Sequence, residues 1–254
     1  MNGLLLAIQF FTSIPIKKEL PMERKDVTGM YIALPFVGGL IGLAMYGVAV
    51  LFTDVIGTGS LLASVFVVVA AAALTGGLHM DGFADTGDAF FSYRDRGKRL
   101  AILDDPHIGA FGTMAIVLLV TVKIALLEEL IHRNVELLPL FIAVPFLARA
   151  GMNVYFATTR LAKEKGIAHF FKGKLGEGIL MASSIGMSFV ILVAIGAVLH
   201  TFILPVILVF VTTGGVLLFR SWSLKHFGGV SGDLCGAFIE GTEALLWLAI
   251  IICI

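Results

Sequence analysis

The sequence has few charged side chains, and this scarcity argues against a soluble fold. Asp, Glu, Lys and Arg make up 14% of the 254 residues, whereas about a quarter is usual in a soluble domain. Basic and acidic side chains balance at 18 each, so the chain lacks the net positive charge that would attract nucleic acid. The two cysteines, Cys235 and Cys253, exclude a disulfide framework and a zinc-site spacing, and we interpret them as small apolar residues.

The N-terminus also lacks the features of a secretory signal peptide. It begins Met-Asn-Gly-Leu-Leu-Leu, without a basic segment before the apolar run and without a small-residue cleavage site after it. No removable leader is therefore predicted.

Hydrophobic residues dominate what is present: they form 58% of the chain, and the mean hydropathy is +1.00. A transmembrane helix needs about 20 apolar residues, and several runs reach that length. We predict an all-α, polytopic integral membrane protein: one transmembrane domain, 1–254, with about seven transmembrane helices. The predicted spans are 30–52, 61–79, 109–131, 137–158, 178–199, 202–219 and 243–254. The apolar segment 3–16 is too short for a comfortable span, so a short N-terminal helix, re-entrant or interfacial, is predicted there.

Basic residues are unevenly divided between the loops. Alternate loops near 53–60, 132–136 and 200 contribute only Arg133, and the others are rich in Lys and Arg. Under the positive-inside rule the rich loops of this multi-pass protein are cytoplasmic. Both acidic loops, 80–108 and 220–242, then lie on the cytoplasmic side. The rich loops hold four Lys or Arg in 17–28, four in 94–99, five in 160–174 and two in 220–225.

Three carboxylates follow the second predicted span with helical spacing. Asp81, Asp85 and Asp88 lie on one face of a helix. Close carboxylates repel one another unless a hard divalent cation, which prefers oxygen ligands, neutralises them. The alternative is a solvated helix end without a function. Because apolar residues flank the acids, metal binding is the favoured interpretation.

A second acidic stretch precedes the next span. Asp105 followed by Pro106 is typical of a helix N-cap with proline at the first helical position. A helix N-terminus also favours a nearby anion such as a phosphate. We predict Asp105 as a fourth metal-binding carboxylate, with Asp104 as the weaker candidate.

A third stretch, 228–243, combines glycines with acids. Asp233, Glu240 and Glu243 share one helix face, and the glycines at 228, 229 and 232 are compatible with a phosphate-cradling loop. That signal is weak, because the stretch matches neither a Walker motif nor a dinucleotide fingerprint.

Arg149 lies inside a predicted span, where a charge is costly and usually functional. It is predicted to reach a phosphate or an acid, with snorkelling as the alternative. The basic residues of 94–99, among them Arg94 and Arg99, either set topology or bind a polyphosphate. Lys123 lies in the outer half of its span and is assigned no role.

Carboxylates that hold a metal, beside cytoplasmic basic residues, are typical of phosphoryl or phosphodiester transfer. The cation neutralises the phosphate oxygens, and a carboxylate accepts the proton of the attacking hydroxyl. The residues also carry a resemblance. The string H-x-D-G-x-x-D-x-x-D at 79–88, the stretch 99–112, the opening 9–15 and the stretch 228–243 together resemble bacterial cobalamin synthases, the adenosylcobinamide-GDP ribazoletransferases. Ser231 stands where Thr is common, and Cys235 also departs from the pattern, but neither change removes an acid.

The resemblance implies the last step of nucleotide-loop assembly in cobalamin synthesis. The 3′-hydroxyl of α-ribazole, or of its 5′-phosphate, attacks the phosphorus joined to adenosylcobinamide in adenosylcobinamide-GDP. GMP leaves, and adenosylcobalamin or its 5′-phosphate forms. It further implies Mg²⁺ as cofactor and the lipid bilayer of the bacterial cell membrane as surroundings, with the active site on the cytoplasmic side. A homo-oligomer is compatible with the sequence. The metal and catalytic set carried over is Asp81, Asp85, Asp88 and Asp105. The expected substrate contacts are His79, Arg94, Arg99, Arg149, Asp233 and Glu240.

Two other functions stay open at this point. A CDP-alcohol phosphotransferase-like lipid synthase also uses clustered aspartates, but its motif places Ala-Arg after the first glycine, and the chain has no Ala-Arg there. A cation transporter needs acids within its spans, whereas here the acids are predicted to lie in two loops on one side.

Overall fold

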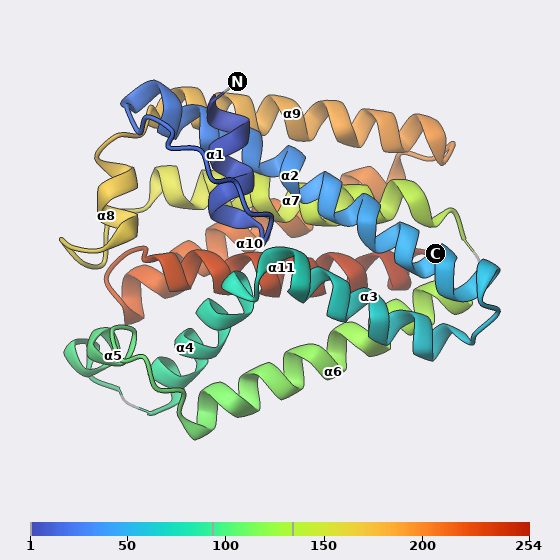
Figure 1. The fold of residues 1–254 in the computed structure, drawn as a ribbon, viewed down its shortest axis with the longest axis horizontal. Helices are drawn as coiled ribbons and strands as arrows, with labels where there is room; N and C mark the ends of the chain where they lie inside the picture. Colours follow the sequence, from blue (N-terminus) through green and yellow to red (C-terminus); the bar gives the residue numbers. More distant parts are fainter. Residues whose placement is uncertain (1, 93, 134) are drawn as a thin grey trace.

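The computed structural model describes residues 2–92, 94–133 and 135–254. Long helices run along the long axis of the molecule, and the short helices α5 and α8 lie at one end (Figure 1). Between Leu161 and Val230 there is an isolated parallel β-bridge. The helices are α1 (Asn2–Phe11), α2 (Arg24–Val50, continued by the π-helical turn Leu51–Val55), α3 (Ser60–Thr75), α4 (Leu78–Ser92), α5 (Arg96–Ile102), α6 (Ala110–His132), α7 (Leu137–Thr158), α8 (Ile167–Lys172), α9 (Glu177–Val198), α10 (Ile203–His226) and α11 (Gly232–Cys253).

In the part of the chain that the structure describes, six helices are long and apolar enough to cross a membrane, namely α2, α6, α7, α9, α10 and α11. The pair α3 and α4 would make a seventh, but its two parts meet at 94°. The prediction of an all-α polytopic membrane protein with a short N-terminal helix is thus confirmed. Large apolar side chains such as Val117, Phe189 and Phe210 are exposed on α6, α9 and α10, as expected for surfaces that face lipid.

Helix α7 forms the centre of the bundle and is buried along most of its length. Its neighbour α2 approaches it closely through glycines. A Cβ on Gly42 would lie 1.9 Å from the carbonyl oxygen of Phe141, and one on Gly38 would lie 2.5 Å from that of Pro145. Small residues of this kind allow close helix packing where no hydrophobic effect drives helices together. The spacing of α2 and α7 is therefore set by the backbone.

Two boundaries differ from the sequence prediction. The predicted span 61–79 ends at Thr75, because Gly76 and Gly77 adopt positive φ angles of 62° and 74° that glycine tolerates best. The predicted loop 220–242 is wrong in large part: α10 continues to His226, and α11 already begins at Gly232. Alternating glycines and acids made this stretch resemble a loop, whereas here Gly236 lies within α11 and contacts the backbone of His79 in α4.

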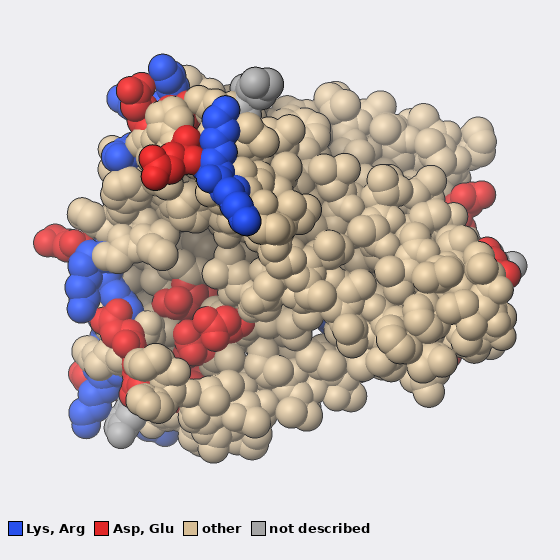
Figure 2. Space-filling model, viewed as in Figure 1, with Lys and Arg blue, Asp and Glu red and all other residues tan. Residues whose placement is uncertain are grey.

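Charge is concentrated at one end of the molecule. On the face shown in Figure 2, basic and acidic side chains gather at the end where α5 and α8 lie, and most of the remaining surface carries neither. Acidic side chains also gather in a hollow near this end (Figure 2). The hollow lies over α4 and the start of α11.

Candidate functional site

Helices α4 and α11 touch through their backbones at two glycines. A Cβ on Gly82 would lie 2.6 Å from the carbonyl oxygen of Asp233, and one on Gly236 would lie 2.9 Å from that of His79. Any larger side chain would force the helices apart. The glycines of the two acidic stretches therefore bring Asp81 and Asp233, which are 152 positions apart in the sequence, to one place.

A cavity of about 320 Å³ opens beside this crossing, and Asp81 and Asp233 both line it. Asp85 lies within electrostatic range of Asp81, Asp88 and Asp233. Ser231 is the N-cap of α11: its hydroxyl accepts a hydrogen bond from the amide of Leu234 (3.3 Å) and donates one to Asp233 (3.2 Å). The crossing thus presents carboxylate oxygens from two helices to one cavity.

Two lysines from the loop between α7 and α8 complete the rim. Lys163 Nζ lies 2.8 Å from Asp104 Oδ1, and Lys165 Nζ lies 3.3 Å from Asp104 Oδ2. The hydrogen bond from Lys163, reinforced by Lys165, lowers the pKa of the Asp104 carboxyl below its usual range. All three side chains line the cavity, so its rim carries both cations and anions at neutral pH.

The glycines before α11 hold this lysine loop in place. Val230 donates its amide to the carbonyl of Arg160 (2.8 Å), and Ala162 donates to the carbonyl of Val230 (2.9 Å). A Cβ on Gly229 would lie 2.2 Å from the Arg160 carbonyl oxygen, and Gly228 has φ of 83° with its carbonyl bonded to Arg160 Nε. These glycines serve a backbone pairing that positions Lys163, and the amide of Gly228 donates to the carbonyl of Ser223 (2.9 Å); the phosphate-cradling role of this stretch stays a prediction.

The four predicted metal carboxylates differ in their exposure and in their hydrogen-bond partners. Asp81 and Asp85 face the crossing, whereas Asp88 is buried and accepts a hydrogen bond from the amide of Gly112 (3.3 Å) in the first turn of α6. Asp105 is exposed, and it accepts hydrogen bonds from the amide (3.0 Å) and ring Nδ1 (2.7 Å) of His107, which lower its pKa. At the cavity it is Asp104, the weaker candidate, that is present.

Among the residues that the structure describes, no group of three or more His, Cys, Asp or Glu side chains converges closely enough to hold a metal ion. The donor chemistry still fits Mg²⁺, because Asp81, Asp85 and Asp233 offer oxygen ligands and an excess of negative charge beside one cavity. The four-carboxylate metal set therefore stays a prediction.

The predicted substrate contacts are divided between four surroundings. His79 and Asp233 line the cavity, and Arg94 is exposed. Arg99 is buried: its guanidinium lies 4.8 Å from the ring centre of Phe90 and 3.0 Å from Nδ1 of His226. Arg99 thereby attaches α5 to the end of α10.

Arg149 and Glu240 belong to an ion network inside the bundle. Lys123 Nζ from α6 binds both Glu240 and Glu243 of α11, and Arg149 Nη1 of α7 lies 2.8 Å from Glu243 Oε1. All four side chains are buried, and their two positive charges balance their two negative charges. The expectation that the acids of loop 220–242 lie outside a span is wrong for Glu240, which is inside α11 together with Glu243. The prediction that Lys123 has no role is also wrong, because its ammonium group is the ion-pair partner of both buried glutamates. Substrate contact by Arg149 and Glu240 stays a prediction.

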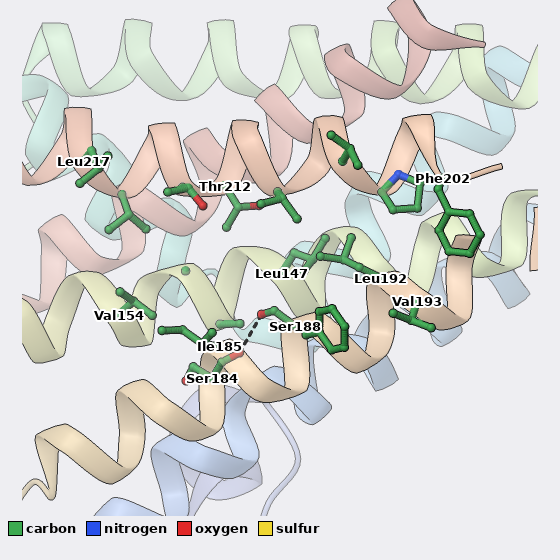
Figure 3. A pocket seen from close by; sticks show the side chains of 18 residues that line it. Leu147, Val154, Ser184, Ile185, Ser188, Leu192, Val193, Phe202, Thr212 and Leu217 are labelled. Atoms are coloured by element: carbon green, nitrogen blue, oxygen red, sulfur yellow. Dashed lines mark hydrogen bonds between the residues drawn. The ribbon is translucent and has the colours of Figure 1, made fainter. Parts of the chain in front are cut away.

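A larger cavity elsewhere lacks the groups needed for the chemistry. It has about 480 Å³ and lies between α7, α9 and α10, where apolar side chains and a few hydroxyls line it (Figure 3). Ser188 Oγ donates to the backbone carbonyl of Ser184 (2.8 Å), so one of these hydroxyls is already satisfied. None of the described residues that line it is an Asp, Glu, Lys or Arg, and the acidic cavity remains the candidate active site.

The sequence prediction missed Lys163 and Lys165. Their loop holds five basic residues in 160–174, and this count was interpreted as a topology signal only. What identifies these two lysines is that they lie close in space to the glycine-rich stretch before α11. A single sequence does not reveal that proximity.

Comparisons with known proteins give one consistent family. Residues 3–251 match the family model described as cobalamin-5-phosphate synthase. The chain is 34% identical over 255 residues to an adenosylcobinamide-GDP ribazoletransferase of Geobacillus kaustophilus (strain HTA426), covering 97% of this chain and 94% of the relative. It is 30% identical to one of Clostridioides difficile (strain 630), with 96% and 94% covered. No solved structure gives a significant match.

Proposed function

This chain belongs to the cobalamin-5-phosphate synthase family, and we propose that it transfers the adenosylcobinamide-phosphate group of adenosylcobinamide-GDP to α-ribazole or its 5′-phosphate. The curated relatives carry the name of this reaction. The 3′-oxygen of the ribose forms a bond to the phosphorus attached to cobinamide. The bond from this phosphorus to the bridging oxygen breaks, GMP leaves with that oxygen, and adenosylcobalamin or its 5′-phosphate remains.

The acidic cavity supplies the groups that this reaction needs from the protein. Lys163 and Lys165 stand at the rim with Asp104 as their present partner, and their ammonium groups suit the diphosphate of the donor. Asp81 and Asp233 lie across the cavity, where a carboxylate can accept the proton of the attacking hydroxyl. When substrate binds, its phosphates would replace Asp104 as the ion-pair partner of the two lysines.

We propose Mg²⁺ as the cofactor, with Asp81, Asp85 and Asp233 as its first candidate ligands; Asp88 and Asp105 complete the set that the family resemblance implies. Bound there, the ion would offset the negative charge of the phosphate oxygens. The carboxylates are negatively charged and repel the phosphate oxygens. A cation must therefore bind to them before an anionic substrate can approach.

The observation that carries the proposal is the backbone contact of α4 with α11, which presents Asp81 and Asp233 to one cavity. The test is GMP release by the detergent-solubilised protein, given adenosylcobinamide-GDP, α-ribazole and Mg²⁺. We expect release that depends on α-ribazole and falls by a factor of about 1,000 in Asp85→Asn, because the variant loses a charged ligand of the proposed ion.

The matched control is Asp54→Asn, which alters an exposed acid at the far end of α2. GMP release by this variant should equal that of the unaltered protein. A folded preparation that releases no GMP contradicts the proposed reaction, and CDP-alcohol substrates should then be tried. Full activity of Asp85→Asn contradicts the site and leaves the reaction standing.

A further inference from the structure

Part of the acidic cavity is lined by aromatic residues that have no role in the proposed phosphate chemistry. One wall is aromatic, with Phe10, Phe11, Tyr31, Phe156 and Phe171 among the lining residues. Tyr31 stacks on Phe156 with ring centres 5.2 Å apart, and Phe171 meets Tyr31 edge-on at 5.9 Å. The charged rim residues are exposed or partly exposed, whereas Tyr31, Phe156 and Phe171 are buried. The cavity therefore leads from a charged mouth to an apolar chamber.

His79 is the histidine among the residues that line this chamber. Its side chain is buried, with 3% of the residue exposed, and its ring is stacked against Phe11 at 6.4 Å. Nε2 has no hydrogen-bond partner among the described residues. Because a buried polar atom without a partner is unfavourable, native structures usually satisfy it. A ligand that offers a hydrogen-bonding atom would do so here.

We propose that the chamber binds the planar base of the acceptor nucleoside, stacked among these aromatic rings, with His79 Nε2 as its hydrogen-bond donor. The inference rests on the proposed function and adds where one of its two substrates binds. The base of α-ribazole is a dimethylbenzimidazole, which is flat and apolar and has one ring nitrogen free to accept a hydrogen bond. Its chemistry matches a chamber of aromatic rings with a single unsatisfied histidine nitrogen.

The guanine of the donor substrate fits the chamber less well. Guanine carries several donors and acceptors around its edge, and an aromatic wall would leave most of them buried without partners. With the acceptor base inside, its ribose comes to the rim, where Asp81 and Asp233 lie. The 3′-hydroxyl would then lie beside the carboxylates and the rim lysines.

The decisive probe is an acceptor in which a C–H group replaces the free ring nitrogen, the corresponding indole riboside. The unaltered protein should prefer α-ribazole by about tenfold in kcat/KM, the effect of one buried hydrogen bond. His79→Leu should lose this preference, and His79→Asn, which keeps a donor, should recover part of it. A general defect of folding or of chemistry would lower kcat/KM equally for both acceptors.

A second measurement separates this inference from the proposed reaction. Binding of α-ribazole alone, without donor, is followed by equilibrium dialysis. It should weaken about tenfold in Phe11→Leu and His79→Leu and stay unchanged in the control Phe189→Leu, which alters a ring that is 69% exposed on α9. Binding without any GMP release would support the chamber and contradict the reaction. A His79→Leu variant that keeps the preference, or equal use of both acceptors by the unaltered protein, would overturn the inference.

Discussion

Asp88 is the residue whose position most changes the interpretation of the acidic helix. Its buried carboxylate accepts a hydrogen bond from Gly112 in the first turn of α6. A carboxylate in that position satisfies a free amide and interacts favourably with the positive end of the helix dipole. Asp88 therefore stabilises the start of α6, whatever it contributes to a metal ion.

This role predicts a stability difference between two substitutions at one position. Asp88→Ala should lower the free energy of unfolding by about 1–2 kcal/mol, because the amide of Gly112 loses its acceptor. Asp88→Asn keeps a side-chain oxygen and should recover most of that loss. The thermal unfolding midpoint in detergent measures both. If the Asn variant is as unstable as the Ala variant, the hydrogen bond is not what Asp88 contributes.

At the scale of helices, the contact of α4 with α11 predicts that a single methyl group inactivates the protein. Gly82→Ala puts a carbon 2.6 Å from the backbone of Asp233, so α4 and α11 must separate. A displacement of about 1 Å at reacting groups can cost about 100-fold in rate, and we expect a loss of that size in GMP release.

The matched control for this change lies on α11 itself. A Cβ on Gly241 meets nothing within 4 Å, so Gly241→Ala should keep the activity and stabilise the helix by up to about 1 kcal/mol. Equal activities of the two alanine variants would show that the close approach at Gly82 is unimportant for the reaction.

The buried ion network links α6, α7 and α11, and it predicts a non-additive pair of substitutions. Lys123→Met leaves two glutamates with Arg149 as their one remaining partner in the network, and an uncompensated buried charge costs about 3–5 kcal/mol. Adding Glu240→Gln restores neutrality and keeps the pair of Arg149 and Glu243. The double variant should therefore unfold at a higher temperature than Lys123→Met alone. Purely additive losses would contradict charge balance as the reason for the network.

Across the whole molecule, hydrophobicity predicts the architecture well and contacts poorly. Span 137–158 coincides with α7 because apolar length alone defines it. The spacing of Asp81 and Asp85 predicts a shared helix face, which the structure has. Which helices become neighbours decides the ion pair of Lys123 with Glu240. It also decides the position of Lys163 beside Asp104. That information lies in pairs of distant residues, and one sequence does not reveal it.

The orientation of the molecule in the membrane is the remaining prediction, and it concerns the whole chain. The loops rich in Lys and Arg are expected on the cytoplasmic side, which puts the acidic cavity where nucleotides are available. In a background with Cys235→Ser and Cys253→Ser, Lys18→Cys and Asp54→Cys introduce thiols at exposed positions outside the bundle core. A membrane-impermeant maleimide should label Asp54→Cys in intact cells and Lys18→Cys only after the membrane is opened. The reverse pattern would place the cavity outside the cytoplasm. Because GMP and adenosylcobinamide-GDP do not cross a bilayer unaided, that result would also make the proposed reaction impossible in the cell, so this labelling tests the reaction as well as the topology.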